Sequence, residues 1–255
     1  MGKAKGIILK PISAKEANAL VKRVHYSGKV VQNSQLHIGV FYHGRLEGAM
    51  QFGPSLDKRK IQGLVEGTPW NGFLELNRMA FGDVLPRNSE SRAIGVAMKL
   101  LRKHRPDVQW VVSFADATQC GDGTIYRASG FVLTGVKENN STWVLPSGEV
   151  FSSFTATAHR ATEQNGTAGV QYIRDLGGVK ATGYQLRYIY FLDPTARERL
   201  TVPILPFSEI EKRGASMYRG EKIRAGSIEN DAPPVQGGEG GVSPTPALQK
   251  VKADE

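Results

Sequence analysis

The chain has 255 residues, of which 40% are hydrophobic and 8% aromatic, and its net charge is +9. This composition allows a folded core and argues against a collagen-like, coiled-coil or wholly disordered protein, while the single cysteine excludes a disulfide framework. No apolar run is long enough to span a bilayer and the first residues lack a signal-peptide pattern, so we expect a cytoplasmic protein that does not insert into membranes.

The first half of the chain is predicted to form a strand, a helix, a hairpin and a further strand, at residues 7–12, 14–25, 36–53 and 73–81. Ser13 is a suitable N-cap for the helix because Glu16 follows three residues later, which is the pattern of a capping box. The hairpin is expected to turn at Gly44 and Arg45.

The second half alternates helical and strand patterns around one strongly apolar run. We predict helices at 91–104, 124–130 and 166–178, strands at 108–116, 131–137, 184–193 and 202–207, and a small hairpin at 143–155. The run at 108–116 is typical of a central strand buried on both faces. The order of elements favours an α/β fold with a mixed central sheet flanked by helices, and 137–183 is an insertion before the last strands.

The last thirty residues differ in composition from the rest. Residues 226–255 contain five Gly and four Pro with almost no large apolar side chains, so we predict a disordered tail after a folded domain at 1–225. The tail carries a net charge of −3 and leaves +12 on the domain. Such a basic domain suits a polyanionic partner, because neutralising phosphates releases counterions, although a basic protein without such a partner is also common.

The chain carries a set of short motifs, most of them within residues 74–135, whose order and spacing are informative together. These are Leu76-Asn77-Arg78 on a strand, residues 86–92 opening a helix, residues 113–116 ending a strand, residues 123–126 starting a helix, His25-Tyr26, and residues 187–191 on a late strand. In these features residues 5–210 resemble the Mom DNA-modification proteins of bacteriophages, which belong to the GNAT (N-acetyltransferase-like) superfamily. The resemblance implies a GNAT-like, mostly antiparallel sheet.

The resemblance also implies an activity on double-stranded phage DNA. Adenine would be converted to N6-carbamoylmethyladenine, which protects the DNA from host restriction, and the base would have to be flipped out of the stack. The added group has the atoms of a glycyl residue, so acetyl-CoA alone cannot supply it. We therefore hypothesise glycyl-tRNA as the donor. The alternatives are an acetyl-CoA-dependent N-acetyltransferase that acts on a protein or small-molecule amine, and a nucleic-acid-binding protein without activity.

Five residues are candidates for the chemistry. Asp116, at the end of the apolar strand, could act as a base, and Tyr126 could protonate a leaving group. His25 could relay a proton and Tyr26 could stack on the flipped base, while Arg78 could stabilise an oxyanion. The alternatives are that Asp116 caps a loop, that Tyr126 is a packed aromatic, and that Arg78 pairs with Glu75 or Asp116.

Two further groups of polar residues are candidates for binding. A predicted helix N-terminus with Arg87, Ser89, Ser91 and Arg92 could hold a phosphate-bearing donor, or the serines could simply cap the helix. This turn lacks the glycines that let a backbone approach a pyrophosphate, which makes coenzyme A a doubtful donor. DNA phosphates are expected at Lys22, Arg23, Lys29, Lys58, Arg59 and Lys60, unless these form a solvated face, and the insertion 137–183 is a possible DNA contact.

The sequence contains no recognised spacing of metal ligands, so we predict no metal site. It leaves the oligomeric state open, a homodimer included.

Overall fold

A computed structural model describes residues 3–118, 121–139, 142–152, 168–181, 183–215, 217–218 and 221–222. The predicted disordered tail at 226–255 lies outside the described residues, as does the middle of the insertion. None of the helices in the described part of the chain has the length and apolar character needed to cross a membrane.

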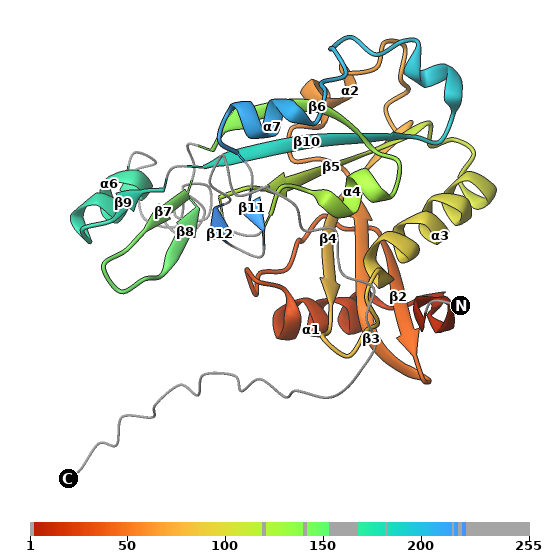
Figure 1. Cartoon of the computed structure of the whole chain (residues 1–255), viewed down its shortest axis with the longest axis horizontal. Helices are drawn as coiled ribbons and strands as arrows, with labels where there is room; N and C mark the ends of the chain where they lie inside the picture. The colour runs from red at the N-terminus through yellow and green to blue at the C-terminus, as the bar shows by residue number, and fades with distance from the viewer. Residues whose placement is uncertain are drawn as a thin grey trace, which may run out of the picture. The chain divides into compact units, whose positions relative to one another are not determined.

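A seven-stranded sheet forms the centre of the fold (Figure 1). Its strands in spatial order are β1 (Ile8–Pro11), β2 (Leu36–Tyr42), β3 (Arg45–Gly53), β4 (Phe73–Phe81), β5 (Trp110–Asp116), β10 (Tyr184–Phe191) and β6 (Val132–Glu138). Only β4 and β5 pair in parallel, and all other neighbours are antiparallel. The predicted mixed, mostly antiparallel sheet is therefore confirmed.

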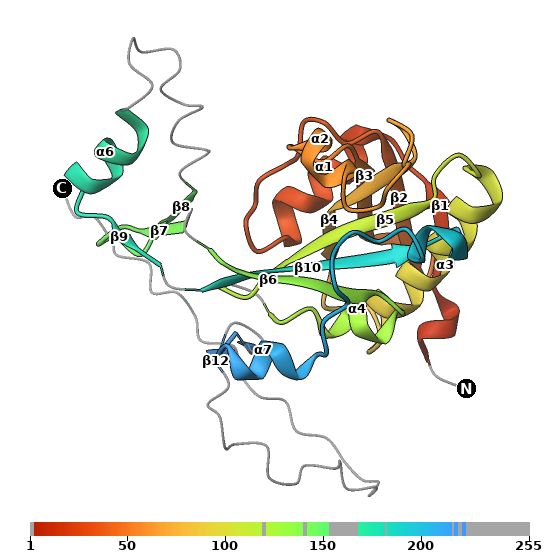
Figure 2. The ribbon, with the colours of Figure 1, turned by 90° about the horizontal axis from the view of Figure 1, so that it is seen from above.

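Helices cover both faces of this sheet (Figure 2). One face carries α1 (Ala14–Val24) and α2 (Lys58–Gln62), and the other carries α3 (Ser89–His104), α4 (Thr124–Ala128) and α7 (Ser208–Lys212). The main apolar core lies on the α3 side and includes Met98 from the helix and Val111 from β5. The opposite face has two smaller cores, one against α1 and one against the segment that follows α2.

Short elements extend this core. Two 3-10 turns are η1 (Lys3–Gly6) and η2 (Pro194–Arg197). The described part of the insertion forms a second sheet of β8 (Val150–Ser152), β7 (Thr142–Val144) and β9 (Val179–Lys180), with α6 (Ala168–Asp175) packed through Ile173 against Trp143. A last pair of short strands is β11 (Met217–Tyr218) and β12 (Glu221–Lys222).

Local sequence explains how several elements begin and end. The expected capping box starts α1: the Ser13 backbone N–H donates to the Glu16 carboxylate at 2.8 Å, and the Glu16 N–H donates to the Ser13 hydroxyl at 3.2 Å. The hairpin turn lies one residue earlier than predicted, at His43 and Gly44, because both adopt the positive φ that a tight two-residue turn requires.

The predicted last strand at 202–207 is wrong. This segment contributes only one isolated bridge, between Leu205 and Leu133, because Pro203 and Pro206 lack the N–H groups that a ladder needs.

The parallel pairing of β4 and β5 is short, and this positions the site. It runs only from Phe73–Trp110 to Glu75–Val112, whereas β4 continues to Phe81 and β5 to Asp116. The hydroxyl of buried Ser113 donates to the Leu76 carbonyl at 3.3 Å, just beyond the last backbone pair. Past this point the two strands separate, so the middle of the sheet opens between their carboxyl ends.

Candidate active site

A cavity of about 440 Å³ occupies the opening between β4 and β5. Its walls are the end of α1 and the next residues (24–26), the far half of β4 (76–79 and 81), the end of β5 (114–116), the start of α4 with its preceding loop (121–126), and Glu90 of α3. This volume lies in the range of small-molecule sites. The five side chains that we predicted to carry the chemistry all line this cavity: His25, Tyr26, Arg78, Asp116 and Tyr126.

Residues from both faces of the sheet line the cavity. Side chains alternate along β5, so Phe114 and Asp116 lie on the α1 side with Trp110 and Val112, while Ala115 lies in the core on the α3 side. Both sets line the cavity.

Asp116 caps the loop that follows β5 and also borders the cavity. Its Oδ1 accepts the backbone N–H of Thr118 at 2.9 Å and the side-chain amide of Asn139 at 3.4 Å. These bonds fix the carboxylate at the strand end where it borders the cavity. Asp116 thus caps the loop, as the alternative expected, and its position beside the cavity is also one that a catalytic base would need.

Tyr126 is almost fully buried in an aromatic group. Its ring centroid lies 5.4 Å from that of Phe131 and 5.3 Å from that of Tyr188. Most of the ring is therefore packed against other aromatic side chains, as the alternative reading of the sequence expected. The Tyr126 side chain still forms part of the cavity wall.

The loop before α4 is held by Tyr188, which the sequence analysis named only as part of the motif at 187–191. The Tyr188 hydroxyl donates to the carbonyl oxygen of Asp122 at 2.5 Å. Burial, reinforced by the nearby Asp122, raises the pKa of Tyr188, so the phenol remains a donor at neutral pH. Gly123 adopts φ +78°, and a Cβ there would lie 2.5 Å from the Tyr188 ring. Only glycine fits between this ring and the start of α4.

His25 is held as a neutral imidazole. Burial, assisted by the positive charge of Arg78, lowers its pKa from 6.5 to about 4. The backbone N–H of Ser27 donates to His25 Nδ1 at 3.1 Å, so Nδ1 is an acceptor and the ring proton is on Nε2. In this state His25 offers a hydrogen-bond donor through Nε2.

Arg78 lies beside His25 and contacts backbone oxygens. Its Nε donates to the Lys29 carbonyl at 3.2 Å and one terminal nitrogen donates to the Asn77 carbonyl at 2.9 Å. None of the ion pairs found among the described residues involves Arg78, so the pairing with Glu75 or Asp116 that the sequence allowed is not formed there. Burial raises the pKa of Glu75, and Ser55, Asn77 and Arg78 oppose that shift.

The four predicted donor residues do not line this cavity. Ser89 is buried and its hydroxyl donates to the Pro86 carbonyl at 2.6 Å, while Arg87 is exposed. Neither serine caps α3: the N-cap is Asn88, with φ 68° and no side-chain capping bond. Ser91 and Arg92 instead border a separate cavity of about 390 Å³, whose other charged residues are Lys5 and Lys99.

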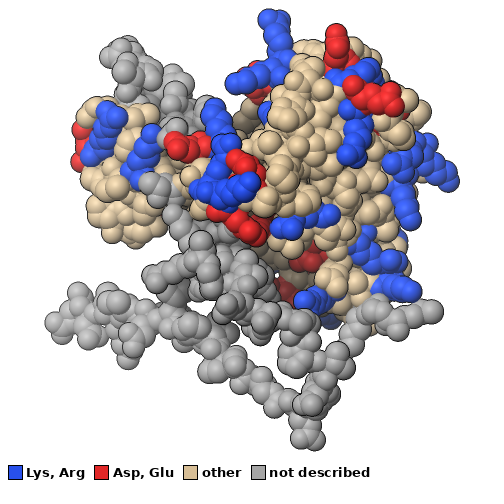
Figure 3. Space-filling model, turned by 45° about the horizontal axis from the view of Figure 1, so that its top comes forward, with Lys and Arg blue, Asp and Glu red and all other residues tan. Residues whose placement is uncertain are grey.

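The predicted DNA-contacting residues lie on the α1 and α2 side. Lys22 and Arg23 are exposed in the last turn of α1, Lys29 is in the following loop, and 58–60 form the start of α2. The Lys58 ammonium lies 4.4 Å from the centroid of the Trp70 ring and donates to the Asn71 side chain at 2.9 Å. On the face drawn in Figure 3, lysine and arginine side chains are spread out and do not gather in one patch.

Several cavity residues were missed by the sequence analysis. Glu90 was not predicted as a site residue, yet it is the residue of α3 that borders the cavity. Phe114 could have been found, because it alternates with Asp116 on the same strand. Within the described part of the chain, no three His, Cys, Asp or Glu side chains gather as a metal site would require.

Comparison with known proteins gives one family and one curated relative. The Mom protein family matches residues 6–209. The methylcarbamoylase Mom of Escherichia phage Mu is 39% identical over 204 residues, which cover 79% of this chain and 82% of that protein.

Solved structures that are similar to this chain include two acetyltransferases. One is NAA60 of Arabidopsis thaliana (10% identity, TM-score 0.46, covering 72% of this chain and 97% of that one). The other is the ribosomal-protein-S18-alanine N-acetyltransferase of Escherichia coli (10% identity, TM-score 0.41, covering 73% and 94%).

Proposed function

The chain belongs to the Mom protein family, and from this premise we propose that it converts adenine in double-stranded phage DNA to N6-carbamoylmethyladenine, which protects the DNA from host restriction. The observation that supports this most is the gathering of His25, Tyr26, Arg78, Asp116 and Tyr126 around one cavity in the sheet opening. A carboxylate, a phenol and a guanidinium around one space provide a base, an acid and an oxyanion partner for acyl transfer.

The acceptor enters from the α1 and α2 side in this proposal. The basic residues Lys22, Arg23 and Lys29 flank His25 and Tyr26 in the chain, so a duplex held by its phosphates would lie next to the cavity. The exocyclic nitrogen of a stacked, paired adenine is inaccessible to acyl chemistry, so the base is flipped. Tyr26, which is 55% exposed at the rim, and Phe114 inside provide aromatic surfaces for stacking.

Asp116 and Tyr126 carry out different proton transfers in this proposal. Asp116 takes the proton from N6 as the nitrogen attacks the acyl carbon, and Tyr126 protonates the leaving oxygen. Because neutral His25 carries its proton on Nε2, it acts as a hydrogen-bond donor to the acyl oxygen, and this replaces the proton relay expected from sequence. Arg78 stabilises the same oxyanion with its charge.

Coenzyme A does not fit the turn before α3. The turn has no glycine between Pro86 and Ser89, Asn88 occupies the left-handed conformation with its own side chain, and the Ser89 hydroxyl is engaged inside the protein. An acetyl group also lacks the nitrogen that the product contains. We therefore propose glycyl-tRNA as the donor, a polyanion that suits the basic domain and the cavity bordered by Lys5, Arg92 and Lys99.

The chemistry balances with this donor. N6 attacks the glycyl ester carbon, the C–O bond to the tRNA breaks, and the 3′ oxygen leaves as a hydroxyl. The free glycyl amine then attacks C6 of the purine through a five-membered ring, and the original C6–N6 bond breaks. The former N6 becomes the terminal carboxamide, so no further atom is required.

Two measurements test the proposal. Mass spectrometry of nucleosides from DNA of cells that express the chain should show an adenine derivative heavier by one glycyl residue, and its absence would contradict the activity. Purified protein should form the same product on plasmid DNA with glycyl-tRNA. Formation with acetyl-CoA and an amine source, but not with glycyl-tRNA, would refute the donor.

A further inference from the structure

The turn between β3 and α2 presents a leucine to solvent. Leu56 is 92% exposed, although the residue before it, Ser55, is only 4% exposed. The residue after it, Asp57, caps α2 by accepting the Lys60 backbone N–H at 3.3 Å. Leu56 therefore lies between a buried residue and a helix cap, and its apolar side chain extends into solvent.

This turn is attached to the wall of the sheet cavity. The carbonyl oxygen of Pro54 accepts the side-chain amide of Asn33 at 2.7 Å and that of Asn77 at 3.5 Å. Asn77 lines the cavity next to Arg78. Two residues of extended chain span at most about 7 Å, so the backbone of Leu56 lies within about that distance of Pro54, which Asn77 of the cavity wall contacts.

Positive charge surrounds the leucine. Lys58, Arg59 and Lys60 follow it after the capping Asp57, and the Lys58 ammonium lies over the half-exposed ring of Trp70. We call these five residues, Leu56, Lys58, Arg59, Lys60 and Trp70, the α2 patch. Its apolar tip with adjacent cations is complementary to a nucleic-acid duplex, which offers phosphates outside and stacked apolar faces inside.

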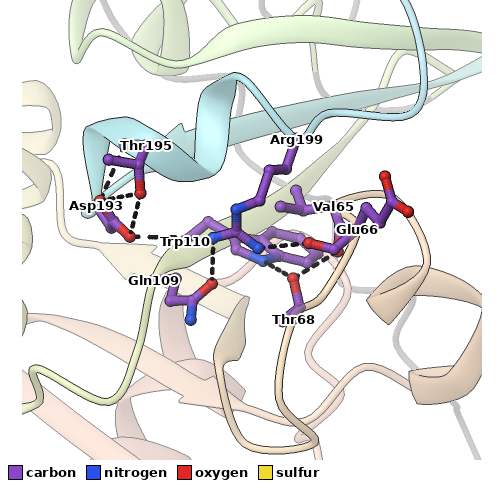
Figure 4. A network of polar contacts seen from close by, with 8 residues as sticks. All are labelled: Val65, Glu66, Thr68, Gln109, Trp110, Asp193, Thr195 and Arg199. Atoms are coloured by element: carbon purple, nitrogen blue, oxygen red, sulfur yellow. Dashed lines mark hydrogen bonds and ion pairs between the residues drawn. The ribbon is translucent and has the colours of Figure 1, made fainter.

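The segment behind the α2 patch is fixed by a polar network (Figure 4). Arg199 donates to the Glu66 carbonyl and, at 2.8 Å, to the side chain of Gln109. The Trp110 indole donates to the Thr68 hydroxyl at 3.0 Å. These bonds connect the loop that carries Trp70 to β5 and to the residues after η2, so the patch has a rigid support.

We propose that Leu56 is a wedge that inserts into the DNA stack beside the target adenine and fills the space that the flipped base leaves. Lys58, Arg59 and Lys60 hold the adjacent phosphates. The inference rests on the proposed function, because it assumes that a duplex adenine must leave its stack. An apolar side chain in that space removes the main drive for the base to return.

The test separates binding, opening of the duplex and modification. Full-length wild-type protein and the Leu56→Ala variant are compared for affinity to a mixed-sequence DNA duplex by fluorescence anisotropy. Opening is measured on the same bound DNA by permanganate oxidation of thymines that have lost their adenine partner, which requires neither the donor nor the sequence context. Modification is measured by nucleoside mass spectrometry of plasmid DNA from expressing cells.

Leu56→Ala is expected to bind DNA within twofold of wild type, while thymine reactivity falls at least fivefold and modification at least tenfold. Leu56→Met should keep both near the wild-type level, because methionine is apolar and has a volume similar to that of leucine. Val84→Ala, which truncates another exposed apolar residue (63% exposed) on the β4–α3 loop, is the matched control and should change none of the three.

Each other result overturns the wedge. Unchanged modification by Leu56→Ala would show that the α2 patch serves another contact, such as a protein partner. Loss of binding together with modification would make Leu56 a docking residue. If the wild-type chain itself leaves adenine unmodified, the proposed function fails and the wedge fails with it, a result that is distinct from failure of the variant alone.

Discussion

The opening between β4 and β5 and the first turn of α3 were both predicted to hold site residues, and they differ in how their side chains are used. In the opening, five predicted side chains from α1, β4, β5 and α4 border one cavity. In the turn, the Ser89 hydroxyl is bonded inside the protein and Arg87 extends to the surface. Strand pairing decides which residues meet at a sheet edge, whereas a turn residue's direction depends on single backbone angles such as φ 68° at Asn88.

Removing the charge of Asp116 should give the largest effect. Asp116→Asn keeps an oxygen for the Thr118 N–H but cannot take a proton, so modification of plasmid DNA should fall by about 10²- to 10⁴-fold, the usual contribution of a general base. Nucleoside mass spectrometry measures it. Asp83→Asn, at an exposed acid outside the cavity, should stay at the wild-type level. Loss of less than threefold in Asp116→Asn would remove Asp116 from the chemistry.

Gly123→Ala tests how tightly the α4 side of the cavity is built. The new Cβ would combine a left-handed φ with a contact to the Tyr188 ring, and we expect the free energy of unfolding to fall by about 2–4 kcal/mol. Gly44→Ala has a similar φ of +77° with nothing within 4 Å of the new atom, and should cost only about 1 kcal/mol. Urea unfolding of both variants gives the comparison. Equal losses would mean that the Tyr188 contact is unimportant.

His25 should make stability depend on acid. Its pKa is about 4 in the folded protein and 6.5 when unfolded, so as pH falls from 6.5 to 4 the unfolded chain takes up the proton first and folding weakens. Because the ring is partly solvent-exposed, we expect a loss of about 1–3 kcal/mol over this range. His25→Gln should lose correspondingly less between pH 7 and pH 4.5 in urea unfolding. Parallel pH profiles of the two proteins would contradict the buried neutral imidazole.

The smallest effect is expected at the cavity bordered by Lys5 and Arg92. Exposed Arg92→Ala should raise the KM for glycyl-tRNA by roughly 2- to 5-fold, the size of one exposed ion pair, with kcat unchanged. Ser89→Ala should leave this KM unchanged and instead lower the free energy of unfolding by about 1 kcal/mol, since it removes a buried hydrogen bond. A larger increase of this KM in Ser89→Ala than in Arg92→Ala would indicate that the donor binds at the turn before α3 and not at the cavity bordered by Lys5 and Arg92.

Much of the fold followed from periodicity and capping. The capping box at Ser13, the apolar run of β5 and the strand of residues 73–81 all occur within about two residues of their predicted bounds. The five-residue helix α2 was missed because 58–62 is too short and too polar to show a helical period. The segment 202–207 looked like a strand from its apolar content, although two prolines prevent a ladder there.

Asp116 was predictable because it ends the apolar strand, and the other four cavity side chains were predicted from motifs that resemble those of a known family. Their chemical states were not predictable. The tautomer of His25 depends on Ser27, and its lowered pKa depends on burial and on Arg78, which is 53 residues away in sequence. The role of Tyr188 depends on β10 packing beside β5 across the insertion, and no local pattern marks that contact. Leu56 could be recognised only from its exposure next to a buried residue.

A crystal structure of the Asp116→Asn protein bound to duplex DNA tests the account most directly. We expect an adenine outside the stack, bound between the separated ends of β4 and β5, with its exocyclic nitrogen facing the side chain at position 116. A duplex that remains fully stacked, or a base bound beside Lys5 and Arg92 with the β4–β5 opening empty, would contradict it.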